Sequence, residues 1–200
     1  MGFSHTHLSG TGVGALGDIL FMPTTGKIKT EPGSRENPSE GYRSCFQHKN
    51  ETAHPGYYSV LLDDYKIKVE LTATERTGYH KYTFPKSDES NVIIDLKHGV
   101  MDTPVDAGFN IVSDRVVEGY KHSSGWAGDH YVYFVAKFSK PFKSYGIAKD
   151  GKITPNEKNG KGAGLKGYVR FSTKDNEEVF VKVGISQVSM AKRSFRSYFP

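Results

Sequence analysis

Cysteine and tryptophan are nearly missing from this 200-residue sequence, since each occurs only once. The single Cys45 has no partner for a disulfide within the chain, so cysteine usage does not indicate an oxidising or a reducing compartment. We expect it to be a small buried side chain within a strand. The sequence also lacks an apolar run of about 20 residues, the length that a membrane-spanning helix needs. No membrane span is therefore expected.

A strong excess of one charge is also lacking along most of the chain. The net charge is +5, but Lys192, Arg193 and Arg196 lie in the last eleven residues, which carry no acid. The rest of the chain has 24 basic and 22 acidic side chains. Binding to backbone phosphates needs concentrated positive charge, so we expect no nucleic-acid partner. The first residues show no basic and apolar leader of the kind that signal peptides have.

The sequence also lacks helical periodicity. Polar and apolar residues alternate instead with a period of two. Residues 66–74 alternate polar and apolar side chains, which predicts a half-buried strand with positions 67, 69, 71 and 73 facing the core. Residues 178–185 repeat the pattern. Residues 131–138 are nearly continuously apolar, which predicts a central strand covered on both faces.

Turn signals separate these runs at the spacing of hairpins. Asp150-Gly151 predicts a tight hairpin turn, and residues 174–177 predict another before the last strand. About ten strand candidates without crossover helices predict an all-β fold of two packed antiparallel sheets in one domain. A single closed barrel is the alternative. Residues 155–164, rich in glycine and lysine, lack the spacing of a phosphate loop and are interpreted as a flexible linker between strands.

The first residues look like a binding loop. Residues 2–13 hold two imidazoles, several hydroxyls and two glycines after Gly2, and on extended backbone His5 and His7 would point to the same side. Such donors and acceptors, next to glycines that let a ligand approach the backbone, suit a sugar. The alternative is a turn whose hydroxyls bond their own backbone. A zinc site at the two histidines would need a further ligand, from His48 or Glu51.

Other candidate residues carry weaker signals. His48 and Glu51 could place an imidazole and a carboxylate on one loop facing a sugar, and the alternative is a solvated loop pair. Arg76, His80 and His98 are predicted at strand positions where they could line a concave sheet. Trp126 could stack on a pyranose ring or could plug a sheet edge. Seven acidic residues are available as a catalytic pair, but spacing in the sequence does not bring any two together.

Six blocks in one order resemble the N-terminal domain of glycoside hydrolase family 92, the calcium-dependent exo-acting α-mannosidases. The blocks cover the chain from Gly2 to about Ser189. They are residues 2–12 (GFSHTHLSGTG) with 17–24, 46–58, 70–85, 93–99, 132–142 and 182–186. After residue 189 the sequence departs from the family pattern, so residues 1–190 are interpreted as the domain and 191–200 as a basic, aromatic tail.

The resemblance implies a β-supersandwich of the galactose-mutarotase-like kind and an exo-α-mannosidase, of α-1,2 linkages, that acts by inversion on mannose-containing glycans. It implies that the catalytic carboxylates and the calcium ligands lie in a following (α/α)6 helical domain. This chain would then supply part of the pocket wall and dock that domain, with no catalytic residue, metal or cofactor of its own. The sugar contacts are expected from His5, Thr6, His7, Ser9, Gly10, His48 and Glu51.

The same resemblance bears on the ends of the chain and on its compartment. A domain that opens inside a binding loop is expected to have lost its first strands, so we expect a fragment truncated at both ends and inactive alone. Members of the family are usually periplasmic, secreted or on the cell surface of glycan-degrading bacteria. The alternative is a stand-alone carbohydrate-binding sandwich without catalysis.

Overall fold

The structure, a computed structural model, describes residues 2–10, 12–34 and 36–188. Fourteen strands and two 3-10 helices form within these ranges. The early elements are β1 (Leu20–Thr25), η1 (Pro38–Glu40), η2 (His48–Asn50), β2 (Glu51–His54), β3 (Tyr57–Leu62), β4 (Ile67–Ala73), β5 (Thr77–Phe84) and β6 (Ser87–Asp95). The later ones are β7 (Thr103–Ile111), β8 (Val116–Gly125), β9 (Gly128–Phe138), β10 (Ser144–Lys149), β11 (Lys152–Pro155), β12 (Asn159–Lys161), β13 (Leu165–Thr173) and β14 (Glu177–Ser186).

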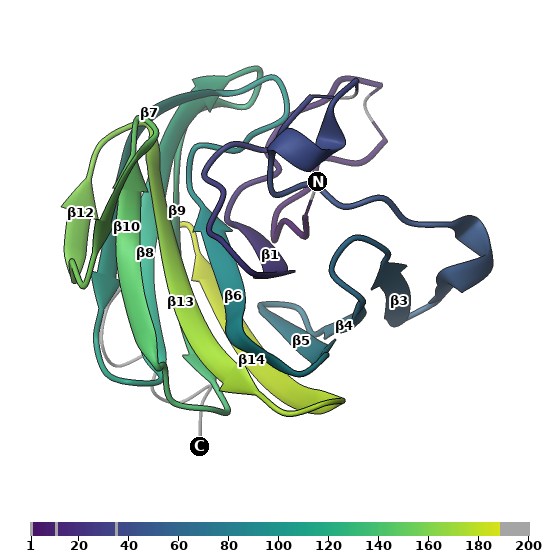
Figure 1. Cartoon of the computed structure of the whole chain (residues 1–200). Coiled ribbons are helices and arrows are strands. Elements are labelled where there is room, and N and C mark those ends of the chain that lie inside the picture. The colour runs from purple at the N-terminus through teal and green to yellow at the C-terminus, as the bar shows by residue number, and fades with distance from the viewer. Residues whose placement is uncertain (1, 11, 35, 189–200) are drawn as a thin grey trace.

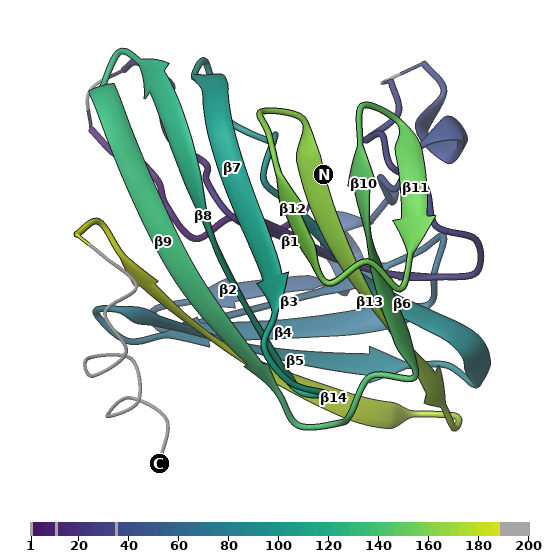
Figure 2. The same ribbon diagram turned by 90° about the vertical axis from the view of Figure 1, so that its left-hand side faces the viewer.

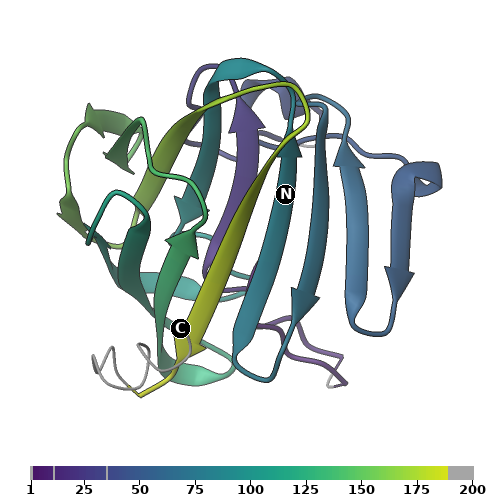
Figure 3. The same ribbon diagram turned by 90° about the horizontal axis from the view of Figure 1, so that it is seen from below.

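These strands form two antiparallel sheets, as the sequence predicts. The small sheet has the order β1-β6-β13-β10-β11, and the large sheet has the order β12-β7-β8-β9-β14-β5-β4-β3-β2. The large sheet curves around the small one (Figure 1), and its far half runs as a row from β14 to β2 (Figure 3). Each sheet ends in two edge strands, so the fold is a sandwich and the alternative of one closed barrel is wrong.

The core lies between the inner faces of the two sheets. Val179, Val181 and Val183 of β14 are fully buried, and so are Val169 and Phe171 of β13. Alternation along β14 therefore places apolar side chains inward, as the period-two pattern predicts. No helix among the described residues is long and apolar enough to cross a membrane.

Two strand predictions hold only in part. Ile67 and Val69 of β4 are buried, but Leu71 is half-buried and Ala73 is exposed, because a cavity opens over this end of the strand. Strand β9 is central, between β8 and β14, yet it is covered on one face only. From Val132 on, its even-numbered residues are buried, whereas Tyr131 is 40% exposed. Hydrophobicity in β9 thus reflects an aromatic outer face rather than a second layer.

The turn predictions are confirmed. Lys149 pairs with Lys152 across a two-residue loop whose Asp150 and Gly151 have φ of 50° and 81°. Positive φ at both loop positions is what a type I′ hairpin requires, and Asp-Gly is one of the residue pairs that tolerate it. Residues 174–177 form the turn between β13 and β14, closed by a hydrogen bond from the Glu177 amide to the Lys174 carbonyl.

Two local predictions are wrong. The segment 155–164 is not a flexible linker, because Asn159–Lys161 forms β12 and pairs with β7. Cys45 is exposed and lies outside any strand. Its backbone is held by polar contacts instead, since its amide donates to Asp64 Oδ2 over 2.6 Å and its carbonyl accepts from the Asp63 amide. The predicted tail, 191–200, lies outside the described residues, as does Thr11.

Candidate functional site

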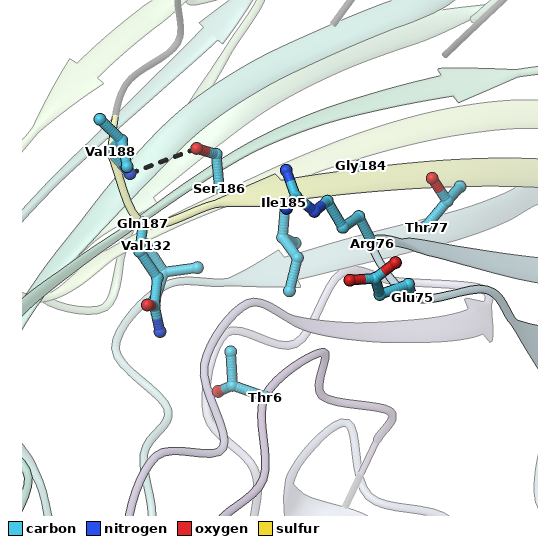
Figure 4. A pocket seen from close by; sticks show the side chains of 10 residues that line it. All are labelled: Thr6, Glu75, Arg76, Thr77, Val132, Gly184, Ile185, Ser186, Gln187 and Val188. Carbon is cyan, nitrogen blue, oxygen red and sulfur yellow. Dashed lines mark hydrogen bonds between the residues drawn. The ribbon is translucent and has the colours of Figure 1, made fainter. Parts of the chain in front are cut away.

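Two adjoining cavities of about 410 and 420 Å³ lie on the inner face of the large sheet. They share four lining residues, Glu75, Arg76, Thr77 and Ile185, and so form one groove. We use "the groove" for the space lined by residues 3–6, 71–78 and 184–188, with Tyr57 and Tyr58. Figure 4 shows one half, where Thr6 faces Ile185 of β14, and Glu75 and Arg76 lie just before the start of β5.

The first residues of the chain form one wall of the groove. Phe3 exchanges two backbone hydrogen bonds of 2.9 Å with Phe21, and the His5 amide donates to the Asp18 carbonyl. Gly2 permits this close approach, because a Cβ atom there would lie 2.7 Å from the Leu20 side chain. The N-terminal segment is therefore bound alongside the start of β1.

His5 lies at the floor of the groove, within a chain of hydrogen bonds. Its Nδ1 is 2.7 Å from the Ile19 carbonyl, and its Nε2 is 3.0 Å from Nε2 of His80. Nδ1 of His80 is 2.7 Å from the hydroxyl of Tyr82. A carbonyl only accepts, so His5 carries a proton on Nδ1. With both imidazoles neutral, His80 donates from Nε2 to His5, the Tyr82 hydroxyl donates to His80, and neither ring has a spare nitrogen. We call this chain the histidine relay.

Burial keeps the relay uncharged. Desolvation lowers the pKa of His5 from 6.5 to about 4, although the bond to the Ile19 carbonyl opposes the shift. Desolvation also lowers the pKa of His80 well below its ordinary value, and the neighbouring His5 lowers it further. The rings of His5 and His80 stack at 4.9 Å between centroids. Near neutral pH the relay acts as a rigid support and holds no charge.

Thr6 is held by a second buried group. Its hydroxyl donates to Asp18 Oδ2 over 2.8 Å and accepts from the Asp18 amide over 2.7 Å. Asp18 Oδ1 in turn pairs with Lys121 Nζ at 2.7 Å, and both charged side chains are almost fully buried. Lys121 also donates to the His98 carbonyl. We call Asp18 and Lys121 the buried ion pair. It fixes the N-terminal segment against β8.

Three further residues of the predicted loop, His7, Ser9 and Gly10, face solvent. His7 and Ser9 are exposed and joined by a 2.9 Å hydrogen bond between Nδ1 and the hydroxyl. Gly10 has a φ of 84°, a left-handed conformation that favours glycine, and open space around it. These three residues therefore keep polar atoms accessible, whereas those of His5 and Thr6 are used inside the protein.

His48 and Glu51 do not line the groove themselves but are linked to it by hydrogen bonds through Tyr58. His48 Nδ1 is 2.8 Å from Glu51 Oε2, and the Tyr58 hydroxyl donates to Glu51 Oε1 over 2.7 Å. The hydrogen bond from Tyr58 lowers the pKa of the Glu51 carboxyl, and the one from His48 lowers it further. Tyr58 lines the groove, whereas His48 is exposed. The structure thus connects this loop with the N-terminal segment across one cavity.

Other sequence candidates fall in different places. Arg76 is not on a strand but in the β4–β5 connection, where it lines both halves of the groove. His80 is on β5 and buried. His98 follows β6, and burial lowers its pKa. Trp126 sits at the β8–β9 turn with 61% of its surface exposed, so it does not plug a sheet edge.

Sequence reasoning missed the partners of His5 and Thr6, although a signal for them exists. Lys121 follows Val117 and Gly119 at an inward position of β8, and His80 precedes Tyr82 and Phe84 at an inward position of β5. A charged or polar side chain at such a position must find a buried partner, because leaving it unpaired is costly. The break in alternation marks both residues.

A metal site does not form from these groups. Over the described ranges, no three side chains of His, Cys, Asp or Glu gather as ligands for an ion. Nor do His5 and His7 converge with His48 or Glu51: His5 bonds to Ile19 and His80, and His48 bonds to Glu51. The zinc site that His5 and His7 would share with His48 or Glu51 therefore does not form among the described residues.

Comparison with known proteins places the chain in a family. The sequence model of the glycosyl hydrolase family 92 N-terminal domain matches residues 1–186. The curated proteins gave no match. Among solved structures, the family GH92 alpha-mannosidase BT3965 from Bacteroides thetaiotaomicron is 39% identical, with a TM-score of 0.94 over 100% of this chain and 28% of its own. The same enzyme in complex with mannoimidazole gives a TM-score of 0.93.

A second solved structure is similar at lower identity. The gh92 family glycosyl hydrolase ccman5 is 25% identical, with a TM-score of 0.76 over 92% of this chain and 26% of its own. The chain thus spans little more than a quarter of the length of the relatives it matches.

Proposed function

Since the chain belongs to glycosyl hydrolase family 92, as the N-terminal domain of that family, we propose that it is the N-terminal part of an exo-acting α-mannosidase. The proposed substrate is a glycan ending in mannose, with an α-1,2 linkage, hydrolysed with inversion. The observation that supports it most is the 39% identity to a GH92 alpha-mannosidase over the whole of this chain. That enzyme has also been solved with mannoimidazole bound.

The proposal assigns the bond cleavage to a helical (α/α)6 domain, with calcium bound there. This is consistent with the chain spanning 28% of BT3965 and with the lack of a metal-ligand cluster in the residues described. Inversion needs two carboxyl groups about 6.5 to 9.5 Å apart, one as acid and one as base. We assign neither role to a residue of this domain. The isolated 200-residue chain is therefore expected to release no mannose.

The groove is the proposed contribution of this domain to the substrate pocket. Directly after Thr6 in the chain, the exposed His7, Ser9 and Gly10 offer accessible polar atoms to sugar hydroxyls, and Arg76 adds a fork of donors in the groove lining. His5 and Thr6 shape this surface from beneath, since their polar side-chain atoms are already bonded to the protein. His48 and Glu51 contribute through Tyr58. The same surface is proposed to dock the helical domain.

Pairing the chain with a helical domain tests the assignment of roles. The chain would be expressed alone and together with a family 92 helical domain, and mannose release would be measured with and without a calcium chelator. We expect release only from the pair and only without chelator. Mannose release by the 200-residue chain alone at an enzymatic rate would overturn the proposal.

Arg76 tests the role of the groove within that pair. We expect Arg76→Ala to raise KM or to weaken assembly by about tenfold, the effect of losing hydrogen bonds from a charged donor. Arg115→Ala is the matched control, because Arg115 is exposed in the β7–β8 connection and lies outside the groove. Equal kinetics and equal assembly in the two variants would contradict the proposed role of the groove in substrate binding and domain docking.

A further inference from the structure

The outer face of the large sheet carries a trough that is separate from the groove. It measures about 380 Å³ and lies over β7, β8 and β12, strands that stand in the foreground of Figure 2. We use "the trough" for the side chains of Asn110, Glu118, Tyr120, Asn159 and Lys161 around Gly108. The groove lies on the opposite face of the same sheet.

Strand register gathers these residues on one face. Tyr120 lies opposite Gly108 and Glu118 opposite Asn110 between β7 and β8. Across β7 and β12, Lys161 lies opposite Gly108 and Asn159 opposite Asn110. Directly opposed residues point to the same side of a sheet, so the set forms one continuous surface.

An aromatic ring forms the wall of the trough. A Cβ atom at position 108 would lie 2.4 Å from the Tyr120 ring, so the ring rests over the glycine. The Tyr120 hydroxyl donates to Asp106 Oδ2 over 2.6 Å, which fixes the ring in place. The wall is therefore rigid and keeps its aromatic surface without rearrangement, as a preorganised binding site requires.

The side chains around the Tyr120 ring have hydrogen-bonding atoms that are not used within the protein. Glu118 Oε1 accepts from Asn110 Nδ2 over 3.1 Å, which leaves the second oxygen of Glu118 and the oxygen of Asn110 as acceptors. In the part of the chain described, the side chains of Asn159 and Lys161 have no hydrogen-bond partner. Donors and acceptors thus alternate around one aromatic wall.

The aromatic surface continues from the trough along β8 and β9. The Tyr120 ring is 6.1 Å from that of Tyr133, which stacks on Tyr131 at 6.1 Å. Tyr131 stacks on His122 at 4.1 Å. We call the rings of Tyr120, Tyr133, Tyr131 and His122 the ladder. It extends the apolar aromatic surface past the length of one sugar unit.

We propose that the trough binds a pyranose unit of a glycan and that the ladder accommodates the units next to it. A pyranose presents apolar C–H groups on its faces and hydroxyls around its rim, which match an aromatic wall flanked by amide, carboxylate and ammonium groups. The charges of Asp106 and Glu118 oppose a phosphate or a nucleic acid. The proposal rests on the proposed function only for the choice of mannose as the probe.

Two-dimensional amide NMR of the full chain tests this site. The chain would be titrated with methyl α-D-mannopyranoside, and with sorbitol as an acyclic polyol. We expect shift changes at amides 106–120 and 159–161 with the pyranoside and none with sorbitol. Equal changes with sorbitol, or no change at these amides, would overturn the proposal.

Variants assign any binding to the side chains of the trough. We expect Lys161→Ala and Glu118→Gln each to raise the dissociation constant for the pyranoside, measured at these amides, about fivefold. Loss of one hydrogen bond would have this effect. Lys152→Ala and Glu157→Gln are matched controls at exposed positions, and both should bind as the unchanged chain does. Wild-type affinity in the two trough variants would refute the site.

The same titration separates this inference from the proposed function. Amides 3–6 and 75–78 report on the groove, and Arg76→Ala should affect only those. Shifts in the trough without mannose release from the paired domains would leave the site standing and count against the mannosidase. Mannose release from the paired domains without shift changes at the trough amides would overturn the trough as a binding site and leave the mannosidase proposal standing.

Discussion

The half-buried imidazole of His5 and the buried imidazole of His80 make the stability of this domain depend on pH. The pKa of His5 is about 4 in the folded chain and 6.5 in a free side chain, so the unfolded state binds more protons between these values. The contribution of His5 is complete above pH 6.5 and is lost as the pH falls toward 4. We expect a loss of up to about 3 kcal/mol in unfolding free energy, measured by urea titration.

A variant separates these histidines from other acid-sensitive groups. His80→Leu removes one titrating ring and should flatten the pH dependence between 4 and 6.5, whatever its effect on absolute stability. His7→Ala is the control, because His7 is exposed and should leave the slope unchanged. The same slope in both variants would contradict the histidine relay.

Lys121 is the residue on which the buried ion pair depends. Lys121→Ala leaves the buried Asp18 carboxylate without its lysine, although Thr6 still donates to Oδ2, so we expect a loss of about 3 to 5 kcal/mol in unfolding free energy. Lys152→Ala, at an exposed position, should change it by less than about 0.5 kcal/mol. The interpretation is wrong if denaturant midpoints show the two variants to be equally stable.

At the scale of elements, the contact between the sheets depends on a missing side chain. A Cβ atom on Gly167 of β13 would lie 2.3 Å from the Phe109 ring of β7. Gly167→Ala should therefore cost about 1 to 3 kcal/mol through overpacking. Adding Phe109→Leu should return part of that loss, so that the double variant loses less than the sum of the single ones. Additive losses, measured by thermal unfolding, would show that this contact does not limit the packing.

Elements also show which sequence signals suffice. Alternation predicts β4 and β14, and Asp150-Gly151 predicts its hairpin, because these signals depend on local backbone and on one buried face. The three residues of β12 carry no such signal, since their glycine and lysine composition resembles a loop. Their pairing with β7 depends on a contact about 50 positions away along the chain, which local pattern does not encode.

For the whole molecule, the two-sheet architecture follows from the sequence, but the groove follows only in part. Of the predicted loops, His5 lines one cavity, and Glu51 is joined to it only through the hydroxyl of Tyr58. The sequence does not reveal that the polar side-chain atoms of His5 and Thr6 are used internally. Those bonds join residues up to 75 positions apart along the chain, so they arise from packing rather than from spacing.

Residues 3–6 belong to no strand of either sheet, apart from one bridge at Phe3, yet they cover His80 and cap Asp18. A domain boundary placed at Leu20, as a count of strands would suggest, keeps the strands of both sheets. It removes Asp18 and His5, so it admits water to the buried Lys121 ammonium, left without its carboxylate, and to His80. Domain trimming for crystallisation or fusion should therefore preserve these opening residues. Their removal would leave the strands in place but expose buried polar side chains to solvent.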